Sequence, residues 1–422
     1  MSDKQDDQQD MVEISRRRLL GTAGAAGAAG LVLGAAGGAA TYAAAGEPSG
    51  GGDAPALATV GAGTVPFRGA HQAGITTPLQ ARGHVVAFDL APGAGRKEAV
   101  ALMRRWSAAA ELLMAGRPVG DGDSGVARDA GPCSLTVTFG FGASFFDRTG
   151  LVARRPAQLE PLPAFSADRL DARRSNGDLW VQIGADDALV AFHALRVIQK
   201  EAGAAAKVRW QMNGFNRSPG ATARPMTARN LMGQVDGTNN PKPTDPDFDR
   251  RIFVAAGGDQ PWMTGGSYAV VRRIRMLLDD WEKLPLEKQE RVIGRRKSDG
   301  APLTGGTETT KPDLDKLGSD GKPVIPVDAH ARISAPEQNG GAAMLRRPFS
   351  FHDGIGPDGT PDAGLLFICW QADPLRGFVP VQRKLDRGDA LSAFIRHEAS
   401  GLYAVPGGPA DGEYVGQRLL EG

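Results

Sequence analysis

Cysteine is scarce in this chain, and the motifs that often contain it are missing. Only two cysteines occur among 422 residues, Cys133 and Cys369, and each lies in a short apolar run typical of a strand. We interpret both as buried free thiols. The sequence has no C-x-x-C, no C-x-x-C-H and no H-E-x-x-H, which argues against a zinc hydrolase and against covalently attached c-type haem.

The chain also lacks an excess of charge of either sign. Its 49 Lys and Arg residues nearly balance 48 Asp and Glu residues. Because nucleic-acid phosphates require a basic surface, we expect no nucleic-acid partner. Apolar residues make up 41% of the chain, enough for a sizeable core, and the length fits two ordinary domains or one large one.

Residues 1–45 have the layout of an export signal. A polar, acidic start ends at Arg16-Arg17-Arg18 before a leucine pair, a weakly apolar stretch follows, and small residues close the segment at Ala43–Ala45. This arrangement resembles a twin-arginine signal peptide; the alternative, a membrane-spanning helix, is disfavoured by the glycine content. The signal predicts export by the twin-arginine translocase to the periplasm, the cell surface or the medium. Cargo of this route crosses the membrane folded, often because a cofactor is inserted first.

The mature chain shows two similar successions of predicted elements. We expect a flexible linker at 46–63, an N-terminal domain at 64–222 and a C-terminal domain at 223–422. Strand and helix patterns predict strands at 83–90, 134–139, 178–183, 208–215, 267–274 and 364–370, and helices at 96–114, 188–201, 279–293, 375–385 and 390–397. Repeated strand–helix–strand–strand–helix–strand sets favour an α+β fold of duplicated ferredoxin-like domains with antiparallel sheets. The Gly-, Pro- and Lys-rich stretch 295–327 indicates a long loop.

Two segments are candidates for a site. Asp236 lies between Gly233 and Gly237, where the backbone could approach a flat ligand closely, although an Asp-Gly pair is more often an ordinary turn. His330 lies near an arginine pair, Arg346-Arg347, but it is one of six histidines and spacing alone does not single it out. The residues by themselves leave both interpretations open.

Taken together, these segments resemble a known family. Gly233-x-x-Asp236-Gly237-Thr238, then His330-x-Arg332, then Leu345-Arg346-Arg347 is similar to the pattern of dye-decolourising peroxidases. The branch that it resembles is exported by the twin-arginine route and includes the deferrochelatase-type enzymes. The resemblance extends over Phe67–Pro78, Gly266–Pro302 and Gly364–Pro406, so it spans nearly all of the mature chain in the expected order.

The resemblance implies one non-covalent haem b per chain, held mainly by the C-terminal half. It also assigns roles: His330 as the axial iron ligand, Asp236 as the distal acid–base, Arg346 as the distal arginine, and Gly237, Thr238 and Asn239 against the haem edge. The implied substrates are hydrogen peroxide and dyes, phenolics or other small organic reductants.

These residue types suit peroxide chemistry. One peroxide oxygen must lose a proton and the other must gain one before the O–O bond breaks heterolytically, and a carboxylate can carry that proton. A permanently charged guanidinium stabilises negative charge on the departing oxygen. Since an unperturbed aspartate titrates near pH 4, a reaction that uses one as its shuttle is expected to run best in acid.

One departure from the family concerns the haem propionates. Many relatives have Asn-Pro-Arg shortly after the ligand histidine, with the arginine near a propionate, whereas this chain has Ala335-Pro336-Glu337. The propionate contact therefore remains open, and Arg332 or Arg347 is the expected substitute.

The resemblance leaves other points open. A deferrochelatase that releases iron from haem and a non-catalytic haem carrier are alternative functions, and a homo-oligomer or an iron-uptake or copper-handling partner remains an option. Bulky dyes would require an electron relay through the protein. Its candidates are the six tryptophans and three of the tyrosines: Trp106, Trp180, Trp210, Trp262, Trp281, Trp370, Tyr268, Tyr403 and Tyr414.

Overall fold

The computed structural model describes residues 59–222 and 227–422. The predicted export signal lies outside the described residues, as does most of the predicted linker, whose residues Thr59–Ala62 form the short helix α2. Within the two described ranges, no helix is both long enough and apolar enough to span a bilayer.

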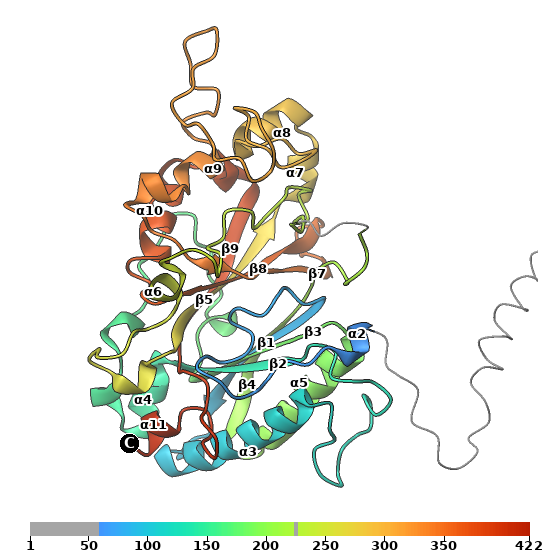
Figure 1. The fold of residues 1–422 in the computed structure, drawn as a ribbon, viewed down its shortest axis with the longest axis vertical. Coiled ribbons are helices and arrows are strands. Elements are labelled where there is room, and N and C mark those ends of the chain that lie inside the picture. The colour runs from blue at the N-terminus through green and yellow to red at the C-terminus, as the bar shows by residue number, and fades with distance from the viewer. Residues whose placement is uncertain (1–58, 223–226) are drawn as a thin grey trace, which may run out of the picture. The chain divides into compact units, whose positions relative to one another are not determined.

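The N-terminal half has the predicted order strand, helix, strand, strand, helix, strand (Figure 1). Its elements are β1 (Arg82–Leu90), α3 (Arg96–Met114), β2 (Thr136–Gly142), α4 (Ala143–Thr149), β3 (Leu179–Ala185), α5 (Ala188–Ala202) and β4 (Ala206–Phe215). Asp187 starts α5, because its side chain accepts hydrogen bonds from the backbone N–H groups of Leu189 and Val190.

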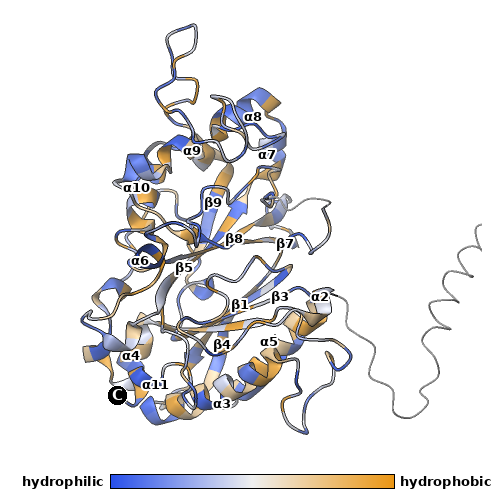
Figure 2. Cartoon of the chain, viewed as in Figure 1, coloured by the Kyte–Doolittle hydropathy of each residue, from blue (hydrophilic) through white to orange (hydrophobic). Residues whose placement is uncertain are grey.

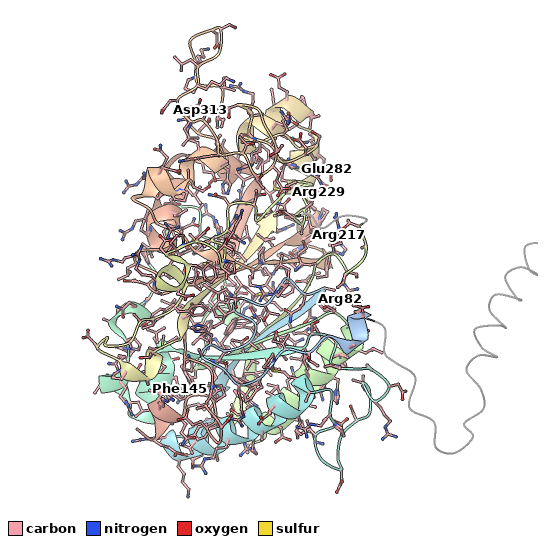
Figure 3. The ribbon with its side chains drawn as sticks, in the orientation of Figure 1. Arg82, Phe145, Arg217, Arg229, Glu282 and Asp313 are labelled. Carbon is pink, nitrogen blue, oxygen red and sulfur yellow. The ribbon has the colours of Figure 1, made fainter. Side chains whose placement is uncertain are left out.

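The C-terminal half repeats this order with shorter helices and longer connections. Its elements are α6 (Phe248–Ile252), β5 (Ser267–Met276), α7 (Leu278–Glu282), α8 (Leu286–Ile293), α9 (His330–Ile333), β6 (Leu345–Arg346), β7 (Phe349–Ile355), β8 (Pro361–Gln371), α10 (Phe378–Gly388), β9 (Ile395–Val405) and α11 (Gln417–Leu420). The long loop between α8 and α9 contains Asp313 and extends beyond these helices (Figure 3).

The strand order confirms the duplicated ferredoxin-like fold. The N-terminal strands are ordered β2-β3-β1-β4 and the C-terminal strands β7-β8-β5-β9, so both halves have the order second, third, first, fourth. All of these pairings are antiparallel. Short pairings of β2 with β9 and of β4 with β7 join the two sheets at both edges.

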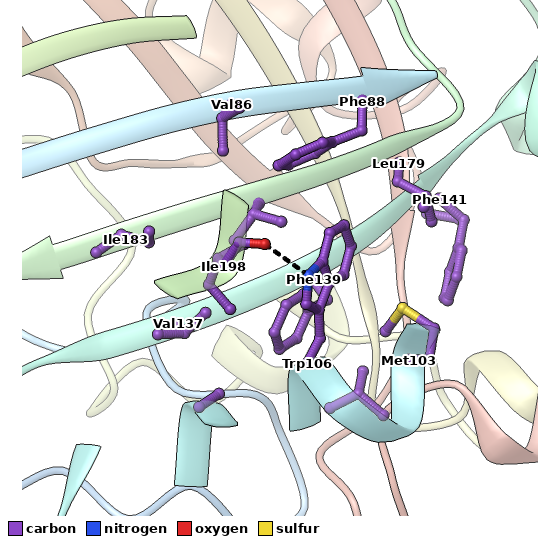
Figure 4. Close-up of a cluster of buried hydrophobic side chains, with 14 of the residues drawn as sticks. Val86, Phe88, Met103, Trp106, Val137, Phe139, Phe141, Leu179, Ile183 and Ile198 are labelled. Carbon is purple, nitrogen blue, oxygen red and sulfur yellow. Dashed lines mark hydrogen bonds between the residues drawn. The ribbon is translucent and has the colours of Figure 1, made fainter. Parts of the chain in front are cut away.

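Each sheet has one face toward the other sheet and one outer face. Between the sheets, Trp180 of β3 stacks on Tyr403 of β9 with ring centroids 5.3 Å apart, and Trp370 of β8 completes the cluster. The outer face of the N-terminal sheet is covered by α3 and α5, which carry apolar residues along their inner sides (Figure 2). There Trp106 packs against Phe88 and Phe139, and its indole N–H donates to the carbonyl of Ile198 at 2.9 Å (Figure 4).

Two predicted helices in the C-terminal half were wrong in part. The single helix expected at 279–293 is divided into α7 and α8, because Pro285 lacks the N–H that a helix interior requires and instead precedes α8. The helix expected at 390–397 is a 3-10 turn at Ala390–Phe394 followed by strand β9. Residues 395–397 extend because β9 pairs with β5 over its length, and this tertiary contact overrides the local apolar spacing.

Candidate active site

A cavity of about 570 Å³ lies against the outer face of the C-terminal sheet, within the size range of about 300–1,000 Å³ typical of small-molecule sites. Its sheet side is mostly apolar, with Ile274 and Met276 from β5, Leu365 and Phe367 from β8, and Ile395 from β9, beside the polar Arg272 and His397. Helices α9 and α10 and the segments 230–245 and 308–314 form its other walls. The position corresponds to the face that α3 and α5 cover in the N-terminal half.

The Asp236 segment enters this cavity as an extended loop. The backbone N–H of Asp236 donates to the carbonyl of Ala228 at 2.9 Å, and Arg229 pairs with Val235. Gly237 has φ of 126°, a conformation that L side chains rarely adopt. Asp236, Gly237, Thr238 and Asn239 all line the cavity, so the structure places the predicted loop residues together.

Arg346 reaches Asp236 from the short strand β6. Its Nη1 donates to Oδ1 of Asp236 at 2.9 Å, and both side chains are partly exposed. The side chain of Asn240 holds the backbone of Arg346 with two hydrogen bonds. Its Oδ1 accepts from the backbone N–H of Arg346 at 3.1 Å, and its Nδ2 donates to the backbone carbonyl of Arg346 at 2.8 Å. The carboxylate and guanidinium are therefore paired inside the cavity.

His330 begins α9 and also lines the cavity. Its Nδ1 is 2.7 Å from Oδ2 of Asp389, whose side chain is only 1% exposed. Burial alone would lower the pKa of His330, but the charge of Asp389 and its hydrogen bond outweigh that effect and raise the pKa above its ordinary value. With Nδ1 engaged, Nε2 is the nitrogen available to a metal.

Sequence reasoning missed Asp389. This aspartate lies 59 positions after His330, and its other oxygen caps the 3-10 turn by accepting from the backbone N–H of Leu391. A capping signal was present in Asp389-Ala390, but nothing in the sequence connected it to the histidine. Arg295, which also lines the cavity, was missed as well.

The two arginines expected to contact a propionate do not line the cavity in the part of the chain that the structure describes. Arg332 donates to the backbone carbonyls of Leu314 and Ile325. Arg347 is buried and donates to the backbone carbonyls of Gly74 and Pro78. Both guanidinium groups hold neighbouring loops in place, which argues against the expected contact.

The residues present fit a haem. One imidazole nitrogen is available to iron, the sheet side is apolar enough for a porphyrin face, and the paired carboxylate and guanidinium lie in the same cavity. Among the described residues, no cluster of three or more His, Cys, Asp or Glu side chains could hold a metal ion, so coordination by one histidine, His330, is consistent with iron that a macrocycle already coordinates.

Comparisons with known proteins identify the family. Residues 72–216 match the family model "Dyp-type peroxidase, N-terminal" and residues 227–410 match "Dyp-type peroxidase, C-terminal". The dye-decolorizing peroxidase of Thermobifida fusca is 46% identical over 364 residues, which cover 84% of each chain. The deferrochelatase of Escherichia coli K12 is 36% identical over 371 residues, covering 84% of this chain and 87% of that protein.

Solved structures give the same result. The DyP-type peroxidase of Streptomyces coelicolor is 74% identical and superimposes with a TM-score of 0.85, over 87% of this chain and all of that one. A protein of Streptomyces lividans, solved in a ferric form, matches with the same identity and TM-score. The resemblance found in the sequence is confirmed: the chain belongs to the Dyp-type peroxidase family of haem peroxidases.

Proposed function

We propose that this chain binds one non-covalent haem b through His330, reduces hydrogen peroxide, and oxidises dyes, phenolics or other small organic reductants. The observation that carries this proposal is the pairing of Arg346 with Asp236 at 2.9 Å in the cavity that His330 also lines. Haem, when bound there, supplies the iron at which the O–O bond is broken and the oxidising equivalents are held.

The distal pair handles the proton and the charge. The carboxylate of Asp236 accepts the proton that one peroxide oxygen loses and returns it to the other oxygen, which leaves as water. The guanidinium of Arg346 stabilises the negative charge that develops on that departing oxygen. Asn240 holds the backbone of Arg346, and Nδ2 of Asn230 lies 3.3 Å from Oδ2 of Asp236, so both groups are oriented before peroxide enters.

Asp389 prepares the proximal side. As a buried acceptor at Nδ1, it keeps the proton on that nitrogen and directs the Nε2 lone pair of His330 toward the ligand position. A carboxylate in this position increases the basicity of the imidazole. His330 therefore becomes a stronger electron donor to a bound metal.

Large reductants would use the protein as a relay. All nine candidate tryptophans and tyrosines are buried in the described structure, so none offers an exposed ring on the surface. The relay stays a prediction, tested by replacing each candidate with phenylalanine. Slower dye oxidation with an unchanged peroxide reaction would identify a relay residue; unchanged dye oxidation in all variants would exclude one.

A deferrochelatase function is the second candidate, because relatives with that name are 35–37% identical to this chain. Incubation with haem would then yield free protoporphyrin. A non-catalytic haem carrier is the third. It would bind haem but show no spectral response to peroxide.

We also propose export by the twin-arginine route, on the basis of Arg17-Arg18 before Leu19-Leu20. Changing both arginines to lysine should retain the protein in the cytoplasm, and fractionation with immunoblotting would measure this. Secretion of the double variant at the wild-type level would contradict the proposed route.

The deciding experiment is an absorption spectrum of the purified protein before and after one equivalent of hydrogen peroxide. We expect a Soret band that shifts within seconds and is lost in His330→Ala. His352→Ala is the matched control, because His352 is exposed on β7. A colourless protein from haem-replete cells, or a His330→Ala variant with an unchanged spectrum, would contradict the proposal.

A further inference from the structure

The haem propionates require a cationic partner that the sequence motif of this chain does not supply. The position expected to hold an arginine is Glu337, which pairs with Lys311 at 2.6 Å. A haem carries two propionate carboxylates, and a carboxylate in a partly buried cavity needs a charge-assisted hydrogen bond to replace its hydration. Another cation must therefore meet at least one of them.

Most charged groups around the cavity already have a partner. Arg346 pairs with Asp236, Lys311 with Glu337, and the deeply buried Arg272 with Asp168. Lys242 is exposed to solvent at the rim. Of the cavity-lining cations that the structure describes, this leaves the half-buried Arg295, which no ion pair joins to a carboxylate.

Arg295 is held firmly but only on one side. It lies in a tight turn after α8, where Arg295 bridges to Pro302 and the backbone N–H of Arg296 donates to the carbonyl of Ala301 at 2.8 Å. Its Nη1 donates to the carbonyls of Gly300 and Glu308 at 2.8 and 2.9 Å. Both bonds use the same nitrogen, so Nε and Nη2 have no hydrogen-bond partner among the described residues and remain for a ligand.

The nearest carboxylate does not neutralise this arginine. The side chain of Glu308 accepts from Thr238 at 2.7 Å rather than from Arg295. Burial, only partly offset by the charge of Glu308, lowers the pKa of Arg295. An anion bound beside Arg295 would stabilise the charged guanidinium and so offset the cost of burying it.

The turn also lies next to the loop that carries Asp236. A Cβ atom on Gly300 would come within 3.1 Å of Val235, the residue before Asp236. Arg229, labelled in Figure 3, joins the two segments by donating to the carbonyls of Gly233 and Lys297. An anion held by Arg295 would thus be fixed relative to Asp236.

We propose that Arg295 binds a propionate of the haem and takes over the role that the Asn-Pro-Arg arginine has in many relatives. The inference rests on the proposed haem binding. It assigns the carboxylate-binding subsite of the cavity to the turn 295–302 instead of to the loop after His330.

The test compares haem with haem dimethyl ester, in which the propionate charges are removed. Both are bound to the stripped protein, and transfer to excess apomyoglobin gives their dissociation rates from the decay of the Soret band. We expect Arg295→Met to accelerate haem release about tenfold, the effect of one lost charge-assisted hydrogen bond, and to leave ester release unchanged. Arg296→Met is the matched control, because Arg296 pairs with Asp299 and lies outside the cavity lining.

The outcomes are distinguishable. If Arg295→Met accelerates the release of haem and ester equally, the arginine only supports the turn, and the proposal is overturned. If haem release is unchanged, Arg295 does not meet a propionate, and again the proposal is overturned. If the wild-type protein gives no Soret band with either compound, the proposed haem function itself fails. Partial recovery of slow haem release in Arg295→Lys would support a charge-based contact.

Discussion

The two halves of the molecule have the same strand order, but the outer face of one sheet is covered by helices and that of the other borders a cavity. In the N-terminal half, α3 and α5 are 19 and 15 residues long, and they fill the outer face of their sheet with side chains such as Trp106. In the C-terminal half, α7, α8 and α10 are 5, 8 and 11 residues long, and a cavity of about 570 Å³ remains against the corresponding face. A duplicated fold can therefore make one copy a support and the other a site.

The difference arises from helix interruption and from polar residues placed on the outer face. Pro285 divides the first C-terminal helix, so no long apolar surface can cover the sheet. Arg272 and His397 project from β5 and β9 into the cavity lining, whereas β1, β2 and β3 supply apolar side chains to the core under α3 and α5. Polar side chains that need partners cannot be packed under a helix without cost.

The largest effect is expected at the distal pair of the C-terminal half. Asp236→Asn or Arg346→Leu should slow the reaction with peroxide about 10²–10⁴-fold, because the proposed proton carrier or charge stabiliser is lost. Stability should change little, since both side chains are partly exposed. Stopped-flow absorbance measures the rate, with Asp245→Asn as a control that lines the same cavity. Wild-type rates in both variants would disprove their roles.

The next largest effect compares the loss of stability when a large side chain is truncated under the helices of the N-terminal half and when one is truncated beside the cavity. Trp106→Ala should lower the free energy of unfolding by about 3–5 kcal/mol, because it empties a packed core. Phe367→Ala should cost only about 1–2 kcal/mol, because Phe367 already borders the cavity. Urea denaturation of the haem-free protein measures both. Equal losses would show that the C-terminal face is as tightly packed as the N-terminal one.

The third comparison uses two capping aspartates. Asp389→Asn should weaken haem binding about 10–100-fold, because the partner of His330 is altered. Asp187→Asn, at the start of α5, keeps its capping role and should leave haem binding unchanged. Haem titration followed by absorbance gives both affinities. A wild-type affinity in Asp389→Asn would mean that the proximal bond is not needed to hold haem.

The smallest effect concerns acid stability of the C-terminal half. Burial, together with the nearby charge of Arg272, lowers the pKa of His397 to about 3, despite the opposing charge of Asp386. Between about pH 6.5 and about pH 3 the unfolded chain then binds a proton that the folded chain does not, so stability falls as the pH falls. His397 should contribute about 1 kcal/mol of this loss between about pH 6.5 and 5.5.

Denaturation curves of wild type and His397→Gln would measure that contribution. The variant should lose less stability on acidification, while above about pH 7.5 the difference between the two proteins should be independent of pH. Parallel curves through the whole range would show that His397 takes up its proton in the folded state as readily as in the unfolded chain.

The sequence by itself determined the elements whose signals are local. Apolar spacing predicted α3 over its observed span of Arg96–Met114, and short β-branched runs predicted β1, β3 and β5. These predictions were possible because the helix and strand periods can be recognised within a few consecutive residues. The motifs around Asp236, His330 and Arg346 gave the family before any geometry was known.

Only the tertiary structure decided how distant residues meet. Strand β9 forms because β5 pairs with it, so the local pattern at 390–397 misled the prediction. Asp389 reaches His330 across 59 positions, and Arg295 is distinguished from Arg332 and Arg347 by which guanidinium lines the cavity. Such contacts depend on chain packing rather than on neighbouring side chains. A sequence therefore lists the charged groups, but the fold decides which of them are paired and which remain for a ligand.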